Sequence, residues 1–254
     1  MSTGTGTHWL DTPGARLAYT HQNGAHVDAP GLFFLPGFRS SRAGLKATHL
    51  GGVARAHGLA FTSVDYRGHG DSGGDFESGD IGLWTADALA VLQAVPTRTH
   101  VLVGSSMGAW IAVRLALAEP ARVHSVVTVA AAPDFTEDLL VPSLSTAERA
   151  ALARGATVYR PSAYGDGPDP ISPTLIEGSR AALVLRRPID VNRPLRALHG
   201  ARDLDVPLAQ SEKLVSLWAC RDRALQVIED GDHRLSRDAD LSALEASIVS
   251  LLGD

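Results

Sequence analysis

The chain has 254 residues, of which 44% are hydrophobic, and this is enough to build one sizeable core. Its net charge is −5 and it contains no long block of Lys or Arg, which excludes the basic footprint typical of proteins that bind nucleic acid or anionic membranes. The single cysteine, Cys220, excludes an internal disulfide and a cysteine-rich metal site.

The start of the chain, residues 1–7, is rich in Ser, Thr and Gly. It has neither the basic nor the apolar region of a secretory signal. No uncharged apolar stretch is long enough to span a bilayer. We therefore expect a cytoplasmic protein in a reducing compartment, in which Cys220 is a small apolar side chain.

An opening β-hairpin is predicted from residues 8–10 and 15–19, which flank a Thr-Pro-Gly turn. Beyond it, short β-branched runs alternate with longer segments rich in Ala and Leu. Strands are predicted at residues 31–35, 60–65, 100–104, 123–130, 195–199 and 224–228. Helices are predicted at residues 44–56, 81–95, 107–118, 208–219 and 239–252. The pattern indicates an α/β fold, with a mostly parallel eight-stranded sheet flanked by helices.

The alternation stops between residues 133 and 194, after the sixth strand, where Pro, Gly and Asp accumulate. We interpret residues 1–254 as a single domain and residues 133–194 as a small lid inserted into it. Within this insertion residues 174–185 have the apolar spacing of a helix. An insertion at this point would lie over the carboxyl ends of the strands, where ligands bind in such sheets.

Residues 104–108 read Gly-Ser-Ser-Met-Gly and lie between the predicted strand at 100–104 and the helix that begins at 107. A Gly-X-Ser-X-Gly motif between a strand and a helix is typical of the tight turn that exposes a nucleophilic serine. The two glycines remove the Cβ atoms that would collide with the strand and the helix. Ser106 occupies the nucleophile position. A chance match is the alternative, since short motifs recur by accident.

A serine hydroxyl needs a general base, and the base needs an acid that orients it. In this type of fold the acid and then the histidine follow the serine along the chain. Asp203 lies in the loop after the predicted strand at 195–199, and His233 lies in the loop after the strand at 224–228. We predict that Ser106, Asp203 and His233 converge.

Each partner of Ser106 has a competitor. Asp205 could replace Asp203, which we favour for its position relative to the strand end, and Asp134 follows an earlier strand. His199 lies at a strand end and is interpreted as a structural histidine. His69, in a Gly-rich loop, precedes the serine and could only contribute contacts.

The tetrahedral intermediate of acyl transfer carries an oxyanion that needs two preorganised donors. The backbone N–H of Met107, at the start of a helix, is one candidate. The other is the N–H of Phe38, which follows a Pro-Gly pair after the strand at 31–35; an ordinary turn is the alternative. Three nearby arginines could approach an anionic substrate but are by default solvated: Arg39, Arg42 and Arg67.

Residues 68–73 match the Gly-X-Gly-X-X-Gly pattern of dinucleotide-binding proteins. That fingerprint requires a helix to begin at once, whereas residues 74–80 intervene. Asp71 and Asp75 would also repel a pyrophosphate. Nucleotide binding is therefore disfavoured, and no cofactor or metal is expected.

Four segments together resemble the α/β-hydrolase superfamily over nearly the full length: residues 34–38, 65–72, 103–108 and 199–203. Within it, these segments and residues 187–189 and 231–234 are most similar to the branch of mitochondrial palmitoyl-protein thioesterase and acyl-glucuronide esterase and its bacterial relatives. The superfamily often has His before the glycine of this loop, whereas this chain has Pro36. The thioesterase branch also has Pro there, so the resemblance argues against a generic lipase. The resemblance implies that Ser106, Asp203 and His233 form the triad and that the 65–72 loop is structural.

We therefore expect a serine hydrolase that cleaves carboxylic ester or thioester bonds of a small molecule or an acylated protein through an acyl-enzyme. One alternative is the same triad acting on another bond, as a carbon–carbon hydrolase, an aminopeptidase or a perhydrolase. The other is a ligand receptor without activity on the same fold. The sequence indicates neither the acyl chain length nor the oligomeric state.

Overall fold

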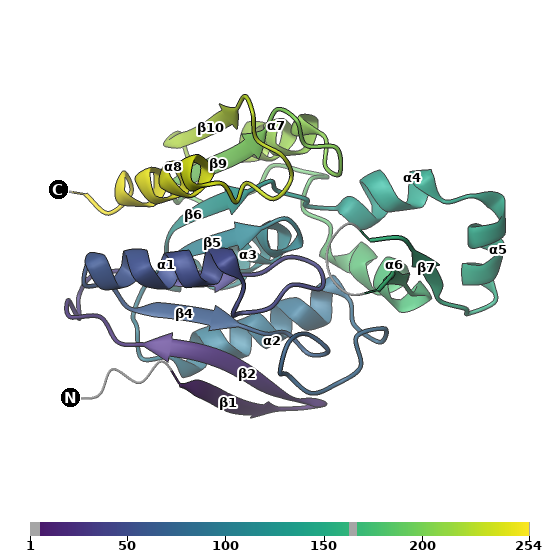
Figure 1. The fold of residues 1–254 in the computed structure, drawn as a ribbon, viewed down its shortest axis with the longest axis horizontal. Helices are drawn as coiled ribbons and strands as arrows, with labels where there is room; N and C mark the ends of the chain where they lie inside the picture. Colours follow the sequence, from purple (N-terminus) through teal and green to yellow (C-terminus); the bar gives the residue numbers. More distant parts are fainter. Residues whose placement is uncertain (1–5, 163–166, 254) are drawn as a thin grey trace.

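An eight-stranded sheet lies at the centre of the computed structural model, which describes residues 6–162 and 167–253 (Figure 1). Its strands are β1 (Thr7–Thr12), β2 (Ala15–Gln22), β3 (Gly31–Leu35), β4 (Phe61–Val64), β5 (His100–Ser105), β6 (Val123–Val129), β9 (Leu195–Gly200) and β10 (Arg223–Ile228). They lie in the order β1-β2-β4-β3-β5-β6-β9-β10. The pairs β1–β2 and β2–β4 are antiparallel, and all later neighbours are parallel. This confirms the predicted fold class.

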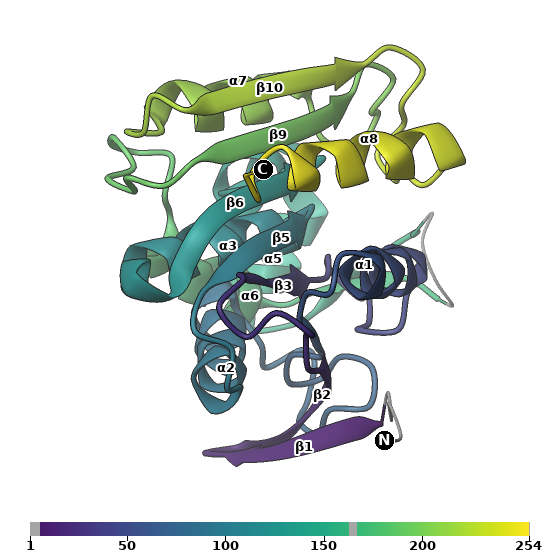
Figure 2. The same ribbon diagram turned by 90° about the vertical axis from the view of Figure 1, so that its left-hand side faces the viewer.

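The five helices of ten or more residues in the described part of the chain cover the two faces of this sheet. Figure 2 shows the two layers that they form. Helices α1 (Leu45–Ala56) and α8 (Asp238–Val249) lie on one face. Helices α2 (Ile81–Ala94), α3 (Met107–Ala118) and α7 (Leu208–Leu217) lie on the other. In the described part of the chain, none of the helices has the length and apolarity needed to cross a membrane.

The central strands are buried on both faces, which explains their continuous apolar runs. Strand β3 shows how one strand supplies two cores. Phe33 packs into the cluster under α2 and α3, whereas its neighbours Leu32 and Phe34 pack into the cluster under α1 and α8. This follows from the alternation of side chains along a strand.

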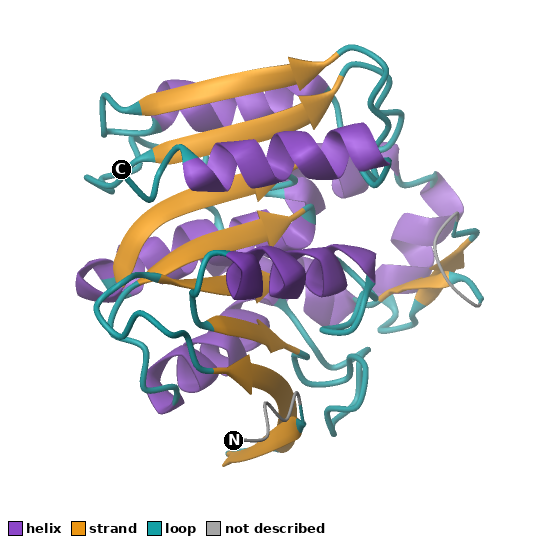
Figure 3. Ribbon diagram, turned by 60° about the vertical axis from the view of Figure 1, so that its left-hand side comes forward, coloured by secondary structure: helices purple, strands orange, loops and turns teal. Residues whose placement is uncertain are grey.

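The segment between β6 and β9 forms a separate layer beyond the carboxyl ends of the strands, on the side to which the strand arrows point (Figure 3). Its elements are a π-helical turn (Thr136–Leu140), α4 (Val141–Ser143), α5 (Thr146–Ala153), β7 (Val158–Arg160), β8 (Asp169–Ile171), α6 (Pro173–Ser179) and a 3-10 turn (Arg180–Ala182). Strands β7 and β8 pair with each other in an antiparallel hairpin.

The helix predicted at residues 174–185 is shorter than expected: α6 ends at Ser179. Two backbone N–H groups beyond it, of Val184 and Leu185, each donate to the carboxylate of Asp134 at 2.8 Å instead of continuing a helix. Helix α5 was not predicted, although Ser145 and Glu148 form a capping box at its start. Residues 1–5 of the Ser/Thr/Gly-rich start and residues 163–166 of the insertion lie outside the described residues.

The two glycines of the Gly-X-Ser-X-Gly motif allow α3 to approach the sheet. A Cβ atom on Gly108 would lie 2.0 Å from the carbonyl oxygen of Leu35, at the end of β3. A Cβ on Gly104 would lie 2.4 Å from the carbonyl oxygen of Gly108. Both are contacts with backbone atoms that cannot rotate away, so any larger residue must push the helix and the strands apart.

We expect Gly108→Ala to lower the free energy of unfolding by about 3 kcal/mol, because the added methyl overpacks a rigid contact. Gly52→Ala is the matched control, since Gly52 lies within α1 and a Cβ there meets no atom within 4 Å. That control should be stabilised by about 0.5 to 1 kcal/mol, because alanine is the better helix former. Urea denaturation of both variants tests this, and equal midpoints would contradict it.

Candidate active site

Ser106 lies between the end of β5 and the start of α3, with φ of 53° and ψ of −119°. A positive φ is unfavourable for a residue with a Cβ and must be held by its surroundings. Its backbone N–H donates to the carbonyl of Val129 on β6 at 2.9 Å, and its carbonyl accepts from Ala109 in the first turn of α3 at 3.0 Å. These bonds hold the tight turn that the sequence motif predicts, with the side chain half-buried.

The structure brings the three predicted side chains together in one hydrogen-bonded chain. His233 Nδ1 lies 2.8 Å from Asp203 Oδ2, and His233 Nε2 lies 3.1 Å from Ser106 Oγ. Because an ionised carboxylate only accepts, Nδ1 carries the proton. In the neutral ring Nε2 is then the acceptor for the serine hydroxyl.

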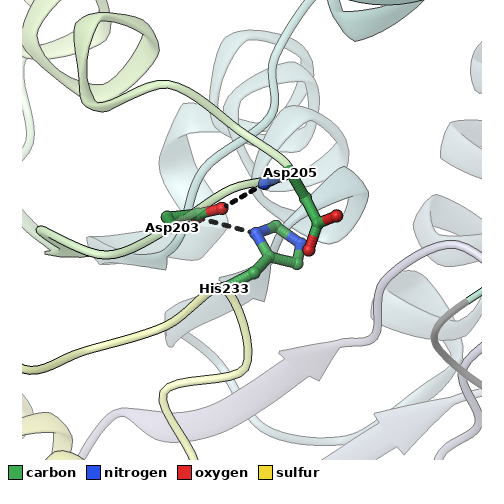
Figure 4. Close-up of side chains that lie close together, drawn as sticks. All are labelled: Asp203, Asp205 and His233. Carbon is green, nitrogen blue, oxygen red and sulfur yellow. Dashed lines mark hydrogen bonds and ion pairs between the residues drawn. The ribbon is translucent and has the colours of Figure 1, made fainter.

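Asp203 is the carboxylate that faces Nδ1 of the imidazole (Figure 4). Its side chain is only 1% exposed. Its other oxygen, Oδ1, accepts from the N–H groups of Asp205 and Val206 at 2.9 and 2.8 Å. Burial disfavours the charged form, but the bonds from His233 and Val206 outweigh it and lower the pKa of the carboxyl. The residue is therefore held as an ionised, oriented acceptor.

The predicted competitors of Asp203 have other contacts. Asp205 is exposed, and its backbone, not its carboxylate, bonds to Asp203. Asp134 is fully buried in the loop after β6, where its two oxygens accept from Val184 and Leu185. It joins the start of the insertion to its end, a role that the sequence did not indicate.

The loops that carry Asp203 and His233 touch each other through two glycines. A Cβ on Gly200 would lie 2.3 Å from the carbonyl oxygen of Gly231. The N–H of Arg202 also donates to that carbonyl at 2.8 Å. Sequence reasoning missed this contact; the signal was one glycine at the end of β9, Gly200, and another three residues after the end of β10, Gly231.

His199 is a buried structural residue, as expected. Burial lowers its pKa, so the ring is neutral. Its Nε2 donates to the carbonyl of Val206 at 3.0 Å, and since a carbonyl only accepts, Nδ1 must accept from the hydroxyl of Ser211 at 2.8 Å. Val206 in turn donates its N–H to Asp203. His199 thus supports the turn that orients the acid.

A cavity of about 440 Å³ opens at Ser106 and His233. The loop after β3 forms one wall of it, and a Cβ on Gly37 would lie 3.3 Å from the carbonyl oxygen of Ser105. Two features fix the position of this loop. The hydroxyl of Tyr66 donates to the carbonyl of Pro36 at 3.1 Å, and the ring of Phe38 packs edge-on against three aromatic rings. Those rings belong to Phe76, Trp84 and Phe135.

The three arginines noted in the sequence differ in their roles. Arg42 pairs with the buried Asp65, and Arg67 forms a bidentate pair with Asp87. Neither lines the cavity, whereas Arg39 does. Arg39 donates to the carbonyls of residues 167 and 168 at 2.9 and 2.8 Å and pairs with Asp169 at 3.2 Å, which connects the loop after β3 to the insertion.

The glycine-rich loop at residues 68–73 packs around Asp65. A Cβ on Gly70 would lie 2.2 Å from its carboxylate, and the N–H of Asp71 donates to it at 3.0 Å. His69 is buried against Phe76 and Trp84, and burial lowers its pKa to about 4. The residues of this loop thus pack against Asp65 and the neighbouring aromatic rings.

Asp203, Asp205 and His233 each offer one possible metal-ligand atom, and these atoms lie within 4.8 Å of one another. Asp203, however, already accepts hydrogen bonds from His233, Asp205 and Val206. The arrangement is that of a hydrogen-bonded acid and base.

Comparison with known proteins identifies the family of the chain. The profile of the Alpha/beta hydrolase family matches residues 32–247. The mitochondrial palmitoyl-protein thioesterase ABHD10 of Mus musculus is 31% identical over 239 residues, which are 93% of this chain and 78% of that protein.

Two solved structures resemble the chain over almost its whole length. The "Putative hydrolase" of Agrobacterium vitis S4 is 36% identical with a TM-score of 0.93, over 97% of this chain and 98% of that one. The mouse alpha/beta hydrolase domain-containing protein 10 is 29% identical with a TM-score of 0.87, over the same shares of the two chains.

The contacts of His199 lead to a test of stability. His199→Phe keeps the ring but leaves the Val206 carbonyl and the Ser211 hydroxyl unpaired, and we expect it to lower the free energy of unfolding by about 1 to 3 kcal/mol. His57→Phe, at an exposed position, should change it by less than about 0.5 kcal/mol. Urea denaturation measures both, and an unchanged His199→Phe variant would show that the two bonds contribute nothing.

Proposed function

Because the chain belongs to the alpha/beta hydrolase family, we propose that it is a serine hydrolase that cleaves carboxylic ester or thioester bonds through an acyl-enzyme intermediate. The observation that carries the proposal is the continuous chain from Asp203 through His233 to Ser106. The relatedness to a palmitoyl-protein thioesterase supports the bond type, and the substrate is a small molecule or an acylated protein.

In this mechanism Ser106 attacks the acyl carbon while His233 Nε2 takes the hydroxyl proton. Asp203 keeps the proton on Nδ1 and stabilises the imidazolium that forms. The tetrahedral intermediate collapses when His233 returns the proton to the leaving alcohol or thiol. Water then attacks the acyl-enzyme with the same histidine as base, and this step releases the acid and restores Ser106.

The backbone N–H groups of Met107 and Phe38 are the proposed oxyanion donors. Met107 is the first residue of α3, where the helix dipole favours a negative charge. Phe38 follows Gly37, whose close approach to Ser105 and Ser106 holds its loop beside the nucleophile. Each such donor is typically worth about 3 kcal/mol in the transition state.

The insertion between β6 and β9 is the proposed lid. It lies beyond the carboxyl ends of the strands (Figure 3). Asp169 of its hairpin lines the cavity together with Ser106. The lid therefore limits the room for the substrate. The single domain over residues 1–254 and the cytoplasmic location stay predictions.

Ser106→Ala should abolish labelling by a fluorophosphonate probe, because such probes react only with an activated serine. Ser105→Ala should still be labelled, since the neighbouring serine is the last residue of β5 and not the one in the turn. Gel fluorescence of the labelled proteins measures this. Labelling that persists in Ser106→Ala would place the nucleophile elsewhere.

Asp203→Asn should lower kcat by several orders of magnitude, because an amide at this position can hold the imidazole in the wrong tautomer. Asp205→Asn should lower it far less, since its carboxylate is not the acceptor from Nδ1. Hydrolysis of p-nitrophenyl acetate measures both. The reverse order of effects would make Asp205 the acid.

A further inference from the structure

The wall of the cavity beside His233 is positively charged. Among the described residues, the Arg, Lys, Asp and Glu side chains that line it are Arg39, Lys46, Arg234 and Asp169. Asp169 pairs with Arg39 at 3.2 Å, so the negative charge of Asp169 is balanced by a neighbour in the same wall. Lys46 lies in the first turn of α1, lines the cavity and approaches the loop that carries His233.

No ion pair joins Lys46 to a carboxylate of the described residues. Its ammonium donates to the carbonyl of Arg234, the residue after His233, and to the hydroxyl of Ser236 at 3.2 Å. Within the described part of the chain the Lys46 ammonium makes these two hydrogen bonds. Since an ammonium has three N–H donors, one of them remains for a ligand. Burial and the charge of Arg234 lower its pKa to about 8, and the charges of Asp232 and Asp240 offset this only in part.

We propose that Lys46 forms a subsite for an anionic group, a carboxylate or a phosphate, on the leaving alcohol or thiol of the substrate. The proposal rests on the proposed function, which defines a leaving group. It assigns to a residue outside the triad the recognition of the part of the substrate that departs first.

The position of Lys46 decides which part of the substrate it meets. His233 must deliver its proton to the leaving atom, so the leaving group lies beside the imidazole. Lys46 is bonded to the residue next to that imidazole, and both line the same cavity. A substrate anion here would accept the remaining ammonium hydrogen, and a charge-assisted bond in a partly dry site is worth enough to select substrates.

The competing explanation is that Lys46 only ties the His233 loop to α1. In that case its loss would disturb catalysis on every substrate alike. The two explanations therefore predict different ratios of the activity on anionic substrates to the activity on neutral substrates. A loss of activity on one substrate alone would not distinguish them.

The experiment compares kcat/KM for 4-acetoxybenzoate, whose leaving group is anionic, with that for the neutral 4-acetoxybenzamide. Lys46→Met removes the charge and keeps the length of the side chain. The matched control is Lys213→Met, because Lys213 is the other lysine of the chain and lies on α7, outside the cavity. Intrinsic reactivities cancel when each variant is compared with the wild type.

We expect Lys46→Met to lower the ratio of anionic to neutral activity by roughly tenfold, the effect of one charge-assisted hydrogen bond. Turnover of the neutral ester should change by no more than about threefold. Lys213→Met should keep the ratio of the wild type. An unchanged ratio in Lys46→Met, or an equal loss on both esters, would overturn the subsite.

A second pair of esters places the anion on the acyl side: mono-p-nitrophenyl succinate against p-nitrophenyl butyrate. If Lys46→Met changed only this ratio, the leaving-group assignment would be wrong. Turnover of the neutral esters by the wild type tests the proposed function separately. If that turnover and fluorophosphonate labelling were both absent, the hydrolase mechanism would fail, whatever the role of Lys46.

Discussion

The site depends on one backbone constraint, the positive φ of Ser106. It is maintained because Gly104 and Gly108 let α3 lie against the ends of β3 and β5, closer than any Cβ would permit. The strained turn raises the serine side chain out of the sheet and places the first N–H of the helix next to it. The geometry of the reacting atoms is therefore fixed by the packing of rigid elements.

The same principle holds for the partners of the serine. Asp203 and His233 lie on loops after two adjacent parallel strands, and close contact between Gly200 and Gly231 brings these loops together. A second layer of bonds supports them, since His199 holds the Val206 turn that donates to Asp203. Buried, fully paired groups of this kind preserve orientation because any movement leaves a polar atom unsatisfied.

Most of the fold and of the candidate triad could be predicted from the sequence, because strand-turn-helix periodicity and loop positions are local signals. The prediction failed where contacts between residues far apart in the sequence determine the structure. The helix predicted at residues 174–185 does not extend to its predicted end, because Asp134, some 50 positions upstream, accepts from the amides of Val184 and Leu185. Arg39 could not be told from a solvated arginine, because its partner Asp169 is remote in sequence. Helix α5 did carry a local signal, the Ser145 and Glu148 capping box, in a segment whose composition suggested irregular structure.

The most direct test is a crystal structure of the protein after reaction with diethyl p-nitrophenyl phosphate. The phosphorylated serine that this reagent forms is a stable mimic of the tetrahedral intermediate. We predict that phosphorus is bonded to Ser106 Oγ, with its phosphoryl oxygen about 2.7 to 3.1 Å from the backbone nitrogens of Met107 and Phe38. Phosphorus on another residue, or a phosphoryl oxygen turned away from both nitrogens, would contradict the account.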